Sequence, residues 1–118
     1  KKLGIACAVI SAETNPVVSR RCEKLNIECV QGVYDKEPEL RRILADWDLN
    51  PEDAAFVGND VGDIACMLHV GVPIAVADAY LEVKAVAKLT TSRMGGQGAV
   101  REVCDWIVEA RSRRASAP

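Results

Sequence analysis

The run from Val57 to Asp63 places three oxygen-bearing side chains within five residues, namely Asn59, Asp60 and Asp63. Carboxylate and amide oxygens are the ligands that a hard divalent cation takes. Mg²⁺ needs only one or two carboxylates when substrate phosphate and water complete its shell. Asp and Asn are also typical of helix N-caps, where they stabilise a helix without any metal. Two interpretations therefore stay open for this run, a magnesium site and a helix cap.

Two further side chains have the chemistry to act on a phosphate group. Ser11 follows an apolar run and can donate a hydrogen bond, whereas Lys36 supplies a positive charge. Phosphoryl transfer depends mainly on positioning and charge neutralisation, so an ammonium group fixed beside a phosphate dianion suits that reaction. Taken alone, Ser11 is more typical of a turn at a strand end, and Lys36 of a solvated surface.

The elements that position these residues follow from the periodicity of apolar side chains. Runs of strand length alternate five times with stretches of helical spacing. The predicted strands are 3–10, 27–30, 54–57, 72–77 and 89–91, and the predicted helices follow Asn15-Pro16, start at Pro38, cover 61–70 and 81–87, and follow the loop 94–98. This order predicts an α/β fold with an open, mostly parallel, Rossmann-like sheet and helices on both faces.

Helical spacing also predicts which side chains point into the core. The predicted inward residues are Leu40, Ile43, Leu44 and Trp47 in the second helix, Ile64, Met67 and Leu68 in the third, and Val100, Val103, Cys104 and Ile107 in the last. Residues 111–118 lack an apolar pattern, so we expect a core over residues 1–110 and a frayed tail over 111–118.

In a sheet of this kind, ligands bind beyond the carboxyl ends of the strands. Each predicted strand is followed by a group that could serve such a site: Ser11, Lys36, the loop 58–63, Asp78 and Gly95-Gly96. We therefore expect hydroxyl, ammonium and carboxylate groups to share one edge of the sheet with flexible glycines.

Composition limits the classes of partner. The chain has 118 residues, 49% of them hydrophobic, which is enough for one packed domain without a disulfide or structural metal. A formal net charge of −2 gives no electrostatic reason to expect nucleic acid or an anionic membrane as a partner. The five cysteines lack metal-ligand spacing, and we expect neither a signal peptide nor a membrane-spanning segment. The sequence predicts a reduced, cytoplasmic protein.

Four blocks in order, at 31–36, 57–63, 75–79 and 95–103, resemble a known family. Together with Ser11 they are similar to the later motifs of the haloacid dehalogenase superfamily. More narrowly, they resemble its small capless branch, which contains 3-deoxy-D-manno-octulosonate 8-phosphate phosphatase and the related C-terminal domain of some acylneuraminate cytidylyltransferases. The resemblance covers residues 3–108.

The resemblance implies a magnesium-dependent phosphatase that acts on a phosphorylated keto-sugar acid through an aspartyl-phosphate. By position, Ser11 would hydrogen-bond a phosphoryl oxygen and Lys36 would neutralise charge. The other implied roles are metal binding by Asn59, Asp60 and Asp63 and substrate binding by Ala12, Gly95, Gly96 and Arg101. The branch is usually homotetrameric, and its glycine-rich C-terminal segment reaches a neighbouring subunit's site, so Gly95, Gly96 and Arg101 are candidates for contacts with that subunit's substrate.

Two departures from the family pattern matter. The family begins with a strand that ends in Asp-x-Asp and supplies the nucleophile, and this segment is absent from the sequence, so we expect the natural protein to be longer. Asn59 replaces the usual metal-ligating aspartate and supplies no charge. The main rival hypothesis is a non-catalytic oligomerisation domain associated with an acylneuraminate cytidylyltransferase. A receiver-like phosphate switch is a third possibility, which the order of the motifs disfavours.

Overall fold

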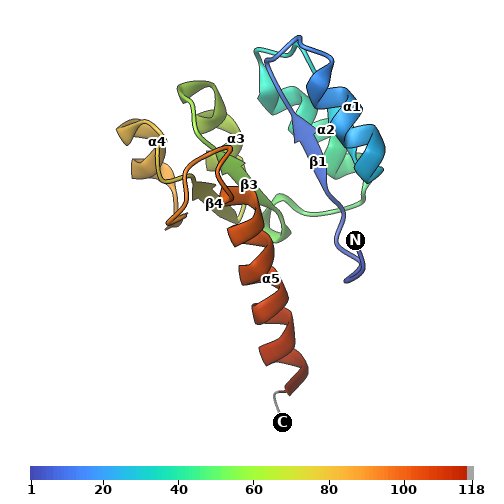
Figure 1. Ribbon diagram of the computed structural model, residues 1–118, viewed down its shortest axis with the longest axis vertical. Coiled ribbons are helices and arrows are strands. Elements are labelled where there is room, and N and C mark those ends of the chain that lie inside the picture. The colour runs from blue at the N-terminus through green and yellow to red at the C-terminus, as the bar shows by residue number, and fades with distance from the viewer. Residues whose placement is uncertain (117–118) are drawn as a thin grey trace. The chain divides into compact units, whose positions relative to one another are not determined.

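The computed structural model of the chain describes residues 1–116. It falls into two compact units, Lys1–Pro51 and Glu52–Pro118, which Figure 1 colours from blue to teal and from green to red. Within the described chain, no helix has both the length and the apolar character that crossing a lipid bilayer requires.

The first unit is built from two parallel strands and two helices. Its elements are β1 (Ala8–Ile10), α1 (Val17–Leu25), β2 (Glu28–Val30) and α2 (Lys36–Asp46). The register pairs Ala8 with Glu28 and Ile10 with Val30, in the parallel sense. Since α1 crosses between two parallel neighbours, this unit is a βαβ motif followed by a second helix.

β1 is shorter than the strand predicted over residues 3–10. Gly4 has a φ of +77°, and its N–H donates to the carbonyl of Lys1 at 3.0 Å, so a tight turn occupies the start of the apolar run. Leu3 is 41% exposed as a result. A glycine in the left-handed region breaks an extended strand, which is why apolar composition alone overestimated its length.

An asparagine precedes helix α1 and another follows it. Asn15 accepts a hydrogen bond from the N–H of Val17 at 3.0 Å through its side-chain oxygen, as expected of a residue that precedes a helix. At the other end Asn26 adopts the left-handed conformation, with φ 54°, and its N–H bonds the carbonyl of Glu23. Between them, Cys22 is the buried residue of the helix.

Helix α2 begins two residues before the predicted start at Pro38. The first turn of a helix tolerates proline, because an N–H there has no intrahelical partner. Leu40, Ile43 and Leu44 are buried as predicted, and Trp47 is half-buried at the C-terminal end of the helix. The important consequence is that Lys36, predicted in a loop, is the first residue of α2.

The second unit contains three parallel strands in sequential order. Its elements are β3 (Ala55–Gly58), the 3-10 helix η2 (Val61–Asp63), α3 (Ile64–His69), β4 (Val72–Ala75), α4 (Leu81–Val86), β5 (Leu89–Thr90) and α5 (Ala99–Ser116), with the 3-10 helix η1 (Pro51–Asp53) at its start. The sheet order is β3-β4-β5, and the register pairs Gly58 with Ala75 and Ala75 with Thr90.

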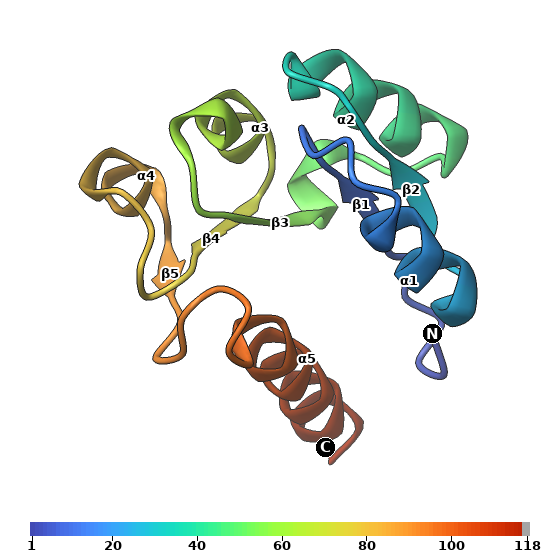
Figure 2. The same cartoon turned by 45° about the horizontal axis from the view of Figure 1, so that its top comes forward.

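Helices cover both faces of this three-stranded sheet. Figure 2 shows α3 and α4 on one side of β3, β4 and β5, and α5 on the other. All strand pairs in both units are parallel, which confirms the predicted α/β class. The five strands form one sheet of two and one of three, where the sequence predicted a single sheet.

The core of the second unit lies between the sheet and its helices. Its buried residues are Met67, Ala75, Val76, Ala79, Val83 and Ala99, with Phe56 and Val57 packed against them. Cys66 and Met67 point inward, whereas Leu68, predicted to be buried, is 70% exposed. Ile64 packs against the core as predicted, so the difference is confined to Leu68, in the last turn of the six-residue helix.

The buried face of α5 also differs from the prediction. Ala99 and Val103, which are four residues apart, are buried, whereas Val100 and Cys104 face solvent. The helix continues to Ser116, through most of the segment predicted as a frayed tail. Residues 117 and 118 of that prediction lie outside the described part of the chain.

Candidate functional site

The first unit holds Ser11 directly after β1. Its N–H donates to the carbonyl of Val30 at 2.8 Å, and its carbonyl accepts from the N–H of Val33 at 3.1 Å, so the parallel ladder extends past β1. Its Oγ accepts a hydrogen bond from the N–H of Glu13 at 3.0 Å. A hydroxyl that accepts one hydrogen bond can still donate its own proton, which is what binding of a phosphoryl oxygen requires.

Lys36 and Ala12 lie at the same edge of this small sheet. Ala12 is half-buried directly after Ser11, and Lys36, also half-buried, follows the carboxyl end of β2 by six residues. Since β1 and β2 are parallel, their carboxyl ends face the same way. The structure therefore confirms that Ser11 and Lys36 follow the same edge of the sheet of the first unit.

The second unit holds Asn59, Asp60 and Asp63 between β3 and α3. Oδ2 of Asp63 accepts from the N–H groups of Asn59 at 3.0 Å and Asp60 at 3.1 Å. Oδ1 of Asp60 accepts from the N–H of Val61 at 2.7 Å, and the two acids form a capping box around η2. Helix capping, one of the two interpretations open at the sequence level, is therefore present.

Capping does not use all of the oxygens of this loop. Asp63 is only 3% exposed and holds the backbone of the loop, which suits a supporting role. Asn59 and Asp60 are exposed at the strand end. Among residues 1–116, no group of three or more His, Cys, Asp or Glu side chains is arranged to hold a metal. The loop offers one or two oxygens, a set that fits Mg²⁺ only if phosphate and water complete its shell. Their role as metal ligands stays a prediction.

Gly58 allows this loop to lie close to α3. A Cβ at position 58 would lie 2.8 Å from Cβ of Asp63 and 2.8 Å from Sδ of Met67. These distances are shorter than any normal contact, so only glycine fits between β3 and the helix that follows. The close approach of the loop to α3 thus depends on glycine at position 58.

The loops after β3, β4 and β5 are joined by hydrogen bonds. The N–H of Tyr80 donates to the carbonyl of Asn59 at 3.3 Å, and the N–H of Gly95 donates to Oδ1 of Asp78 at 2.8 Å. The sequence predicted that Asn59, Asp78 and Gly95 would share the carboxyl edge of the sheet. Within the second unit, the loop after β4 is thus bonded at Tyr80 to Asn59 and at Asp78 to Gly95.

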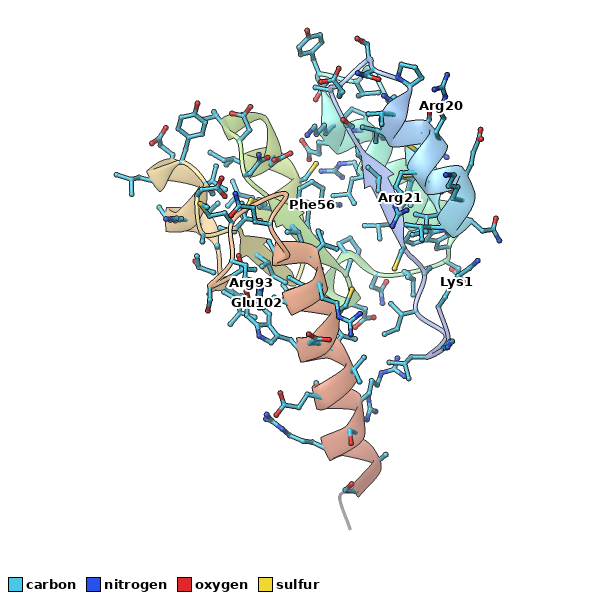
Figure 3. The ribbon with its side chains drawn as sticks, viewed as in Figure 1. Lys1, Arg20, Arg21, Phe56, Arg93 and Glu102 are labelled. Carbon is cyan, nitrogen blue, oxygen red and sulfur yellow. The ribbon has the colours of Figure 1, made fainter. Side chains whose placement is uncertain are left out.

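Two residues that sequence reasoning did not assign, Thr91 and Glu102, hold the start of the glycine-rich loop. The buried Thr91 accepts from the N–H of Ala77 at 3.1 Å and donates to the carbonyl of Arg93 at 2.6 Å. The carboxylate of Glu102 accepts from the N–H groups of Ser92 and Arg93 at 2.9 to 3.0 Å. Figure 3 shows Arg93 and Glu102 side by side at the start of α5. The only sequence signal for Glu102 was a carboxylate four residues beyond the end of the loop 94–98.

The hydrogen bonds to Glu102 have an electrostatic consequence. The backbone N–H of Ser92 is the largest influence, with that of Arg93 also contributing, and together with the nearby Arg93 charge they hold the pKa of the Glu102 carboxyl below its usual range. Hydrogen bonds to the charged form of an acid favour that form. The ionised carboxylate of Glu102 therefore holds the start of the loop through hydrogen bonds.

Arg101 points away from these contacts. Its guanidinium pairs with Asp105 one turn along α5, at 3.1 Å, and the Arg101 side chain is 82% exposed. Contact of Arg101, Gly95 or Gly96 with substrate stays a prediction.

The predicted residues thus divide between the two units. Ser11, Ala12 and Lys36 follow the sheet of the first unit, whereas Asn59, Asp60, Asp63, Gly95, Gly96 and Arg101 belong to the second. The prediction that both sets act on one phosphate stays a prediction.

Comparison with known proteins gives a consistent result. A family model described as haloacid dehalogenase-like hydrolase matches residues 9–102. The 3-deoxy-D-manno-octulosonate 8-phosphate phosphatase of Yersinia pestis is 36% identical over 110 residues, which are 92% of this chain and 59% of that protein. The chain therefore spans about three fifths of the length of this curated relative.

Solved structures of such phosphatases match the fold. The crystal structure of the Yersinia pestis enzyme superimposes with a TM-score of 0.90 at 36% identity, covering 94% of this chain and 60% of that one. The enzyme from Moraxella catarrhalis, in complex with a magnesium ion, a phosphate ion and KDO, gives a TM-score of 0.89 at 32% identity, covering 92% and 63%.

Proposed function

The chain belongs to the haloacid dehalogenase-like hydrolases, and from this premise we propose that the intact protein is a magnesium-dependent phosphatase of a phosphorylated keto-sugar acid, 3-deoxy-D-manno-octulosonate 8-phosphate or a close analogue. One observation supports this most: 36% identity to a phosphatase of that substrate over 92% of the chain. The proposal concerns the whole protein, because the chain spans 59% of that relative.

The proposed reaction proceeds through an aspartyl-phosphate. An aspartate from a segment outside these 118 residues would attack phosphorus, the P–O bond to the sugar would break, and water would then hydrolyse the acyl phosphate. Ser11 would donate a hydrogen bond from its hydroxyl to a phosphoryl oxygen. The hydrogen bond that Ser11 Oγ accepts from the Glu13 N–H leaves the hydroxyl hydrogen available for this contact. Lys36, at the N-terminus of α2, would place a positive charge beside the phosphate.

The second unit would contribute the cation site. Bound magnesium would supply positive charge that stabilises the transferring phosphoryl group. Asn59 and Asp60 would offer ligand oxygens, and Asp63 would hold the backbone of both through the hydrogen bonds of its Oδ2. We place Asp63 behind the ligands because that oxygen already accepts two N–H groups.

A second candidate function has a specific observation in its favour. Asn59 offers a neutral oxygen where the family has a carboxylate, and Asp60 and Asp63 are both engaged in capping η2. These features suit a non-catalytic oligomerisation domain, of the kind associated with an acylneuraminate cytidylyltransferase. Assembly as a homotetramer, with Gly95, Gly96 and Arg101 near a neighbouring subunit's substrate, belongs to both hypotheses as a proposal.

Phosphate release by the intact protein tests the proposal. We expect turnover of 3-deoxy-D-manno-octulosonate 8-phosphate with Mg²⁺, and its loss with EDTA. Ser11→Ala and Lys36→Ala should each lower kcat by about two to three orders of magnitude, because each removes a group that faces developing charge. Lys24→Ala, on the exposed face of α1, and Ser112→Ala, on α5, are the matched controls and should stay near the wild-type rate.

The outcomes separate the two functions. A folded wild-type protein that releases no phosphate from any sugar phosphate would exclude the phosphatase and favour the oligomerisation domain. Normal rates in both Ser11→Ala and Lys36→Ala would show that a different site carries any activity observed.

A further inference from the structure

The carboxamide of Gln31 joins three segments of the first unit. Gln31 is the first residue after β2, and its Nε2 donates to the carbonyls of Glu13 at 2.8 Å and Asn15 at 2.7 Å. Its Oε1 accepts from the N–H of Ser19 in the first turn of α1, at 3.0 Å. One side chain therefore binds the loop after β1, the start of α1 and the end of β2.

These bonds satisfy groups that secondary structure leaves without partners. A loop carbonyl and an N–H in the first turn of a helix have no partner in a regular ladder. The N–H of Gly32 adds a bond to the same Glu13 carbonyl at 3.1 Å. Gln31 and Gly32 both donate to this carbonyl. The residues that directly follow β2 therefore fix the position of the Glu13 carbonyl.

The backbone N–H of Glu13 in turn fixes the hydroxyl of Ser11. The Glu13 N–H donates to Oγ of Ser11 at 3.0 Å, while the Glu13 carboxylate accepts from the N–H groups of Thr14 and Asn15. Glu13 is thus held at its carbonyl and its side chain, and its N–H sets the rotamer of Ser11. Gln31 is thus connected to the Ser11 hydroxyl by two hydrogen bonds, one to the carbonyl and one from the N–H of Glu13, with the Glu13 backbone between them.

We propose that Gln31 is a positioning residue for phosphate binding. By holding the Glu13 carbonyl it fixes the backbone of Glu13, whose N–H orients the Ser11 hydroxyl toward a phosphoryl oxygen. The inference rests on the proposed function, because it takes Ser11 as a phosphate ligand. Gln31 itself contacts no reacting atom. Its effect reaches the phosphate only through Glu13 and Ser11, and this separates it from a residue that merely stabilises the fold.

Two substitutions distinguish hydrogen bonding from packing. Gln31→Met keeps the length of the side chain and loses all three bonds. Gln31→Glu keeps an acceptor for the Ser19 N–H, but places an ionised oxygen against the carbonyls of Glu13 and Asn15. Ser19→Ala is the matched control, since it removes the bond from Ser19 Oγ to the Pro16 carbonyl and leaves the Ser19 N–H bonded to Gln31.

The kinetic test uses the intact protein at a temperature well below unfolding. We expect Gln31→Met and Gln31→Glu to lower kcat roughly 10- to 100-fold, as loss of a supporting hydrogen bond behind a functional group typically does. KM should change much less, because Ser11 acts mainly on the charge that develops during transfer. Ser19→Ala should stay within about twofold of wild type, as expected for a contact remote from Ser11.

A binding measurement separates this inference from the proposed function. Orthovanadate, a phosphate analogue, is titrated with Mg²⁺ present, and both Gln31 variants should bind it at least tenfold more weakly than wild type. If the wild type binds vanadate without turning over any substrate, the phosphatase proposal fails and the vanadate affinities still decide the role of Gln31. Wild-type kcat or vanadate affinity in Gln31→Met would overturn the inference, as would a wild-type protein that binds no vanadate.

Discussion

Asp78 and Gly95 are joined across the carboxyl edge of the second sheet, where the Gly95 N–H donates to Oδ1 of Asp78 at 2.8 Å. Asp78 follows β4, and Gly95 begins the glycine-rich turn between β5 and α5. This bond holds the first residue of the turn, and Glu102 holds the two residues shortly before it, Ser92 and Arg93. Two carboxylates from different elements therefore restrain the segment predicted to contact substrate.

Loss of the Asp78 carboxylate should free the glycine-rich turn. We expect Asp78→Ala to speed amide hydrogen exchange at Gly95 and Gly96, and to lower kcat/KM about tenfold if the turn contacts substrate, since positioning contacts contribute at that scale. Asp78→Asn keeps an acceptor oxygen and should retain most of the protection. Unchanged exchange at Gly95 in Asp78→Ala would show that the bond does not restrain the turn.

Glu102 should make the stability of the second unit dependent on acid. Its folded-state pKa is lowered by the Ser92 and Arg93 N–H groups, so its stabilising effect is complete above the ordinary glutamate pKa and is lost as pH falls through the lowered value. Urea unfolding midpoints should therefore differ between wild type and Glu102→Gln at pH 7 and converge as the pH falls through the lowered pKa of Glu102.

Glu109→Gln is the control for this experiment. Glu109 lies on the same helix and pairs with Arg113 at an exposed position, where an ion pair contributes little. A Glu109→Gln protein as sensitive to pH as Glu102→Gln would contradict the assignment of the effect to the loop.

Gly58 and Gly62 should respond differently to the same substitution. Gly58→Ala places a Cβ 2.8 Å from both Asp63 and Met67, and should cost about 1–3 kcal/mol of stability, as overpacking of a core does. Gly62 has no atom within 4 Å of its would-be Cβ, so Gly62→Ala should be neutral or stabilise by up to about 1 kcal/mol. Chemical denaturation of both variants measures the difference, and equal costs would contradict the close approach at Gly58.

Asn59→Asp should strengthen magnesium binding. The substitution adds a negative charge at the end of β3 without changing side-chain size, and we expect roughly tenfold tighter binding, because ligand charge governs the affinity of hard cations. The Mg²⁺ dependence of turnover, or calorimetry with Mg²⁺ alone, measures the change. Asp60→Asn should act in the opposite direction. No change in either variant would remove this loop from the metal site.

Much of the fold was readable from the sequence, because apolar runs alternate with helical spacing throughout. The parallel strand pairs and the family are confirmed by the structure and by the match over residues 9–102. Errors arose where local geometry overrode composition: the turn at Gly4 shortened β1, and α3 buries Cys66 and Met67 while Leu68 faces solvent. Neither event changes the pattern of apolar residues from which the elements were predicted.

The candidate site was predictable in its residue types and less so in its supporting bonds. Ser11, Asn59 and Asp78 could be predicted as site residues because each follows a strand, and the carboxyl ends of parallel strands lie at one edge of a sheet. Gln31 and Glu102 gave no such signal, since their roles depend on which backbone groups a bent loop leaves unpaired. Such partners become visible only once the path of the loop is known.

In both sheets each strand pairs with a strand adjacent to it along the chain. Ala8 pairs with Glu28, Ala55 with Val72 and Ile74 with Leu89, so every ladder closes over a short stretch of polypeptide. Low sequence separation between contacts favours rapid folding. Each ladder can therefore begin to form once the strand after its crossover helix has left the ribosome, before the rest of the polypeptide has folded.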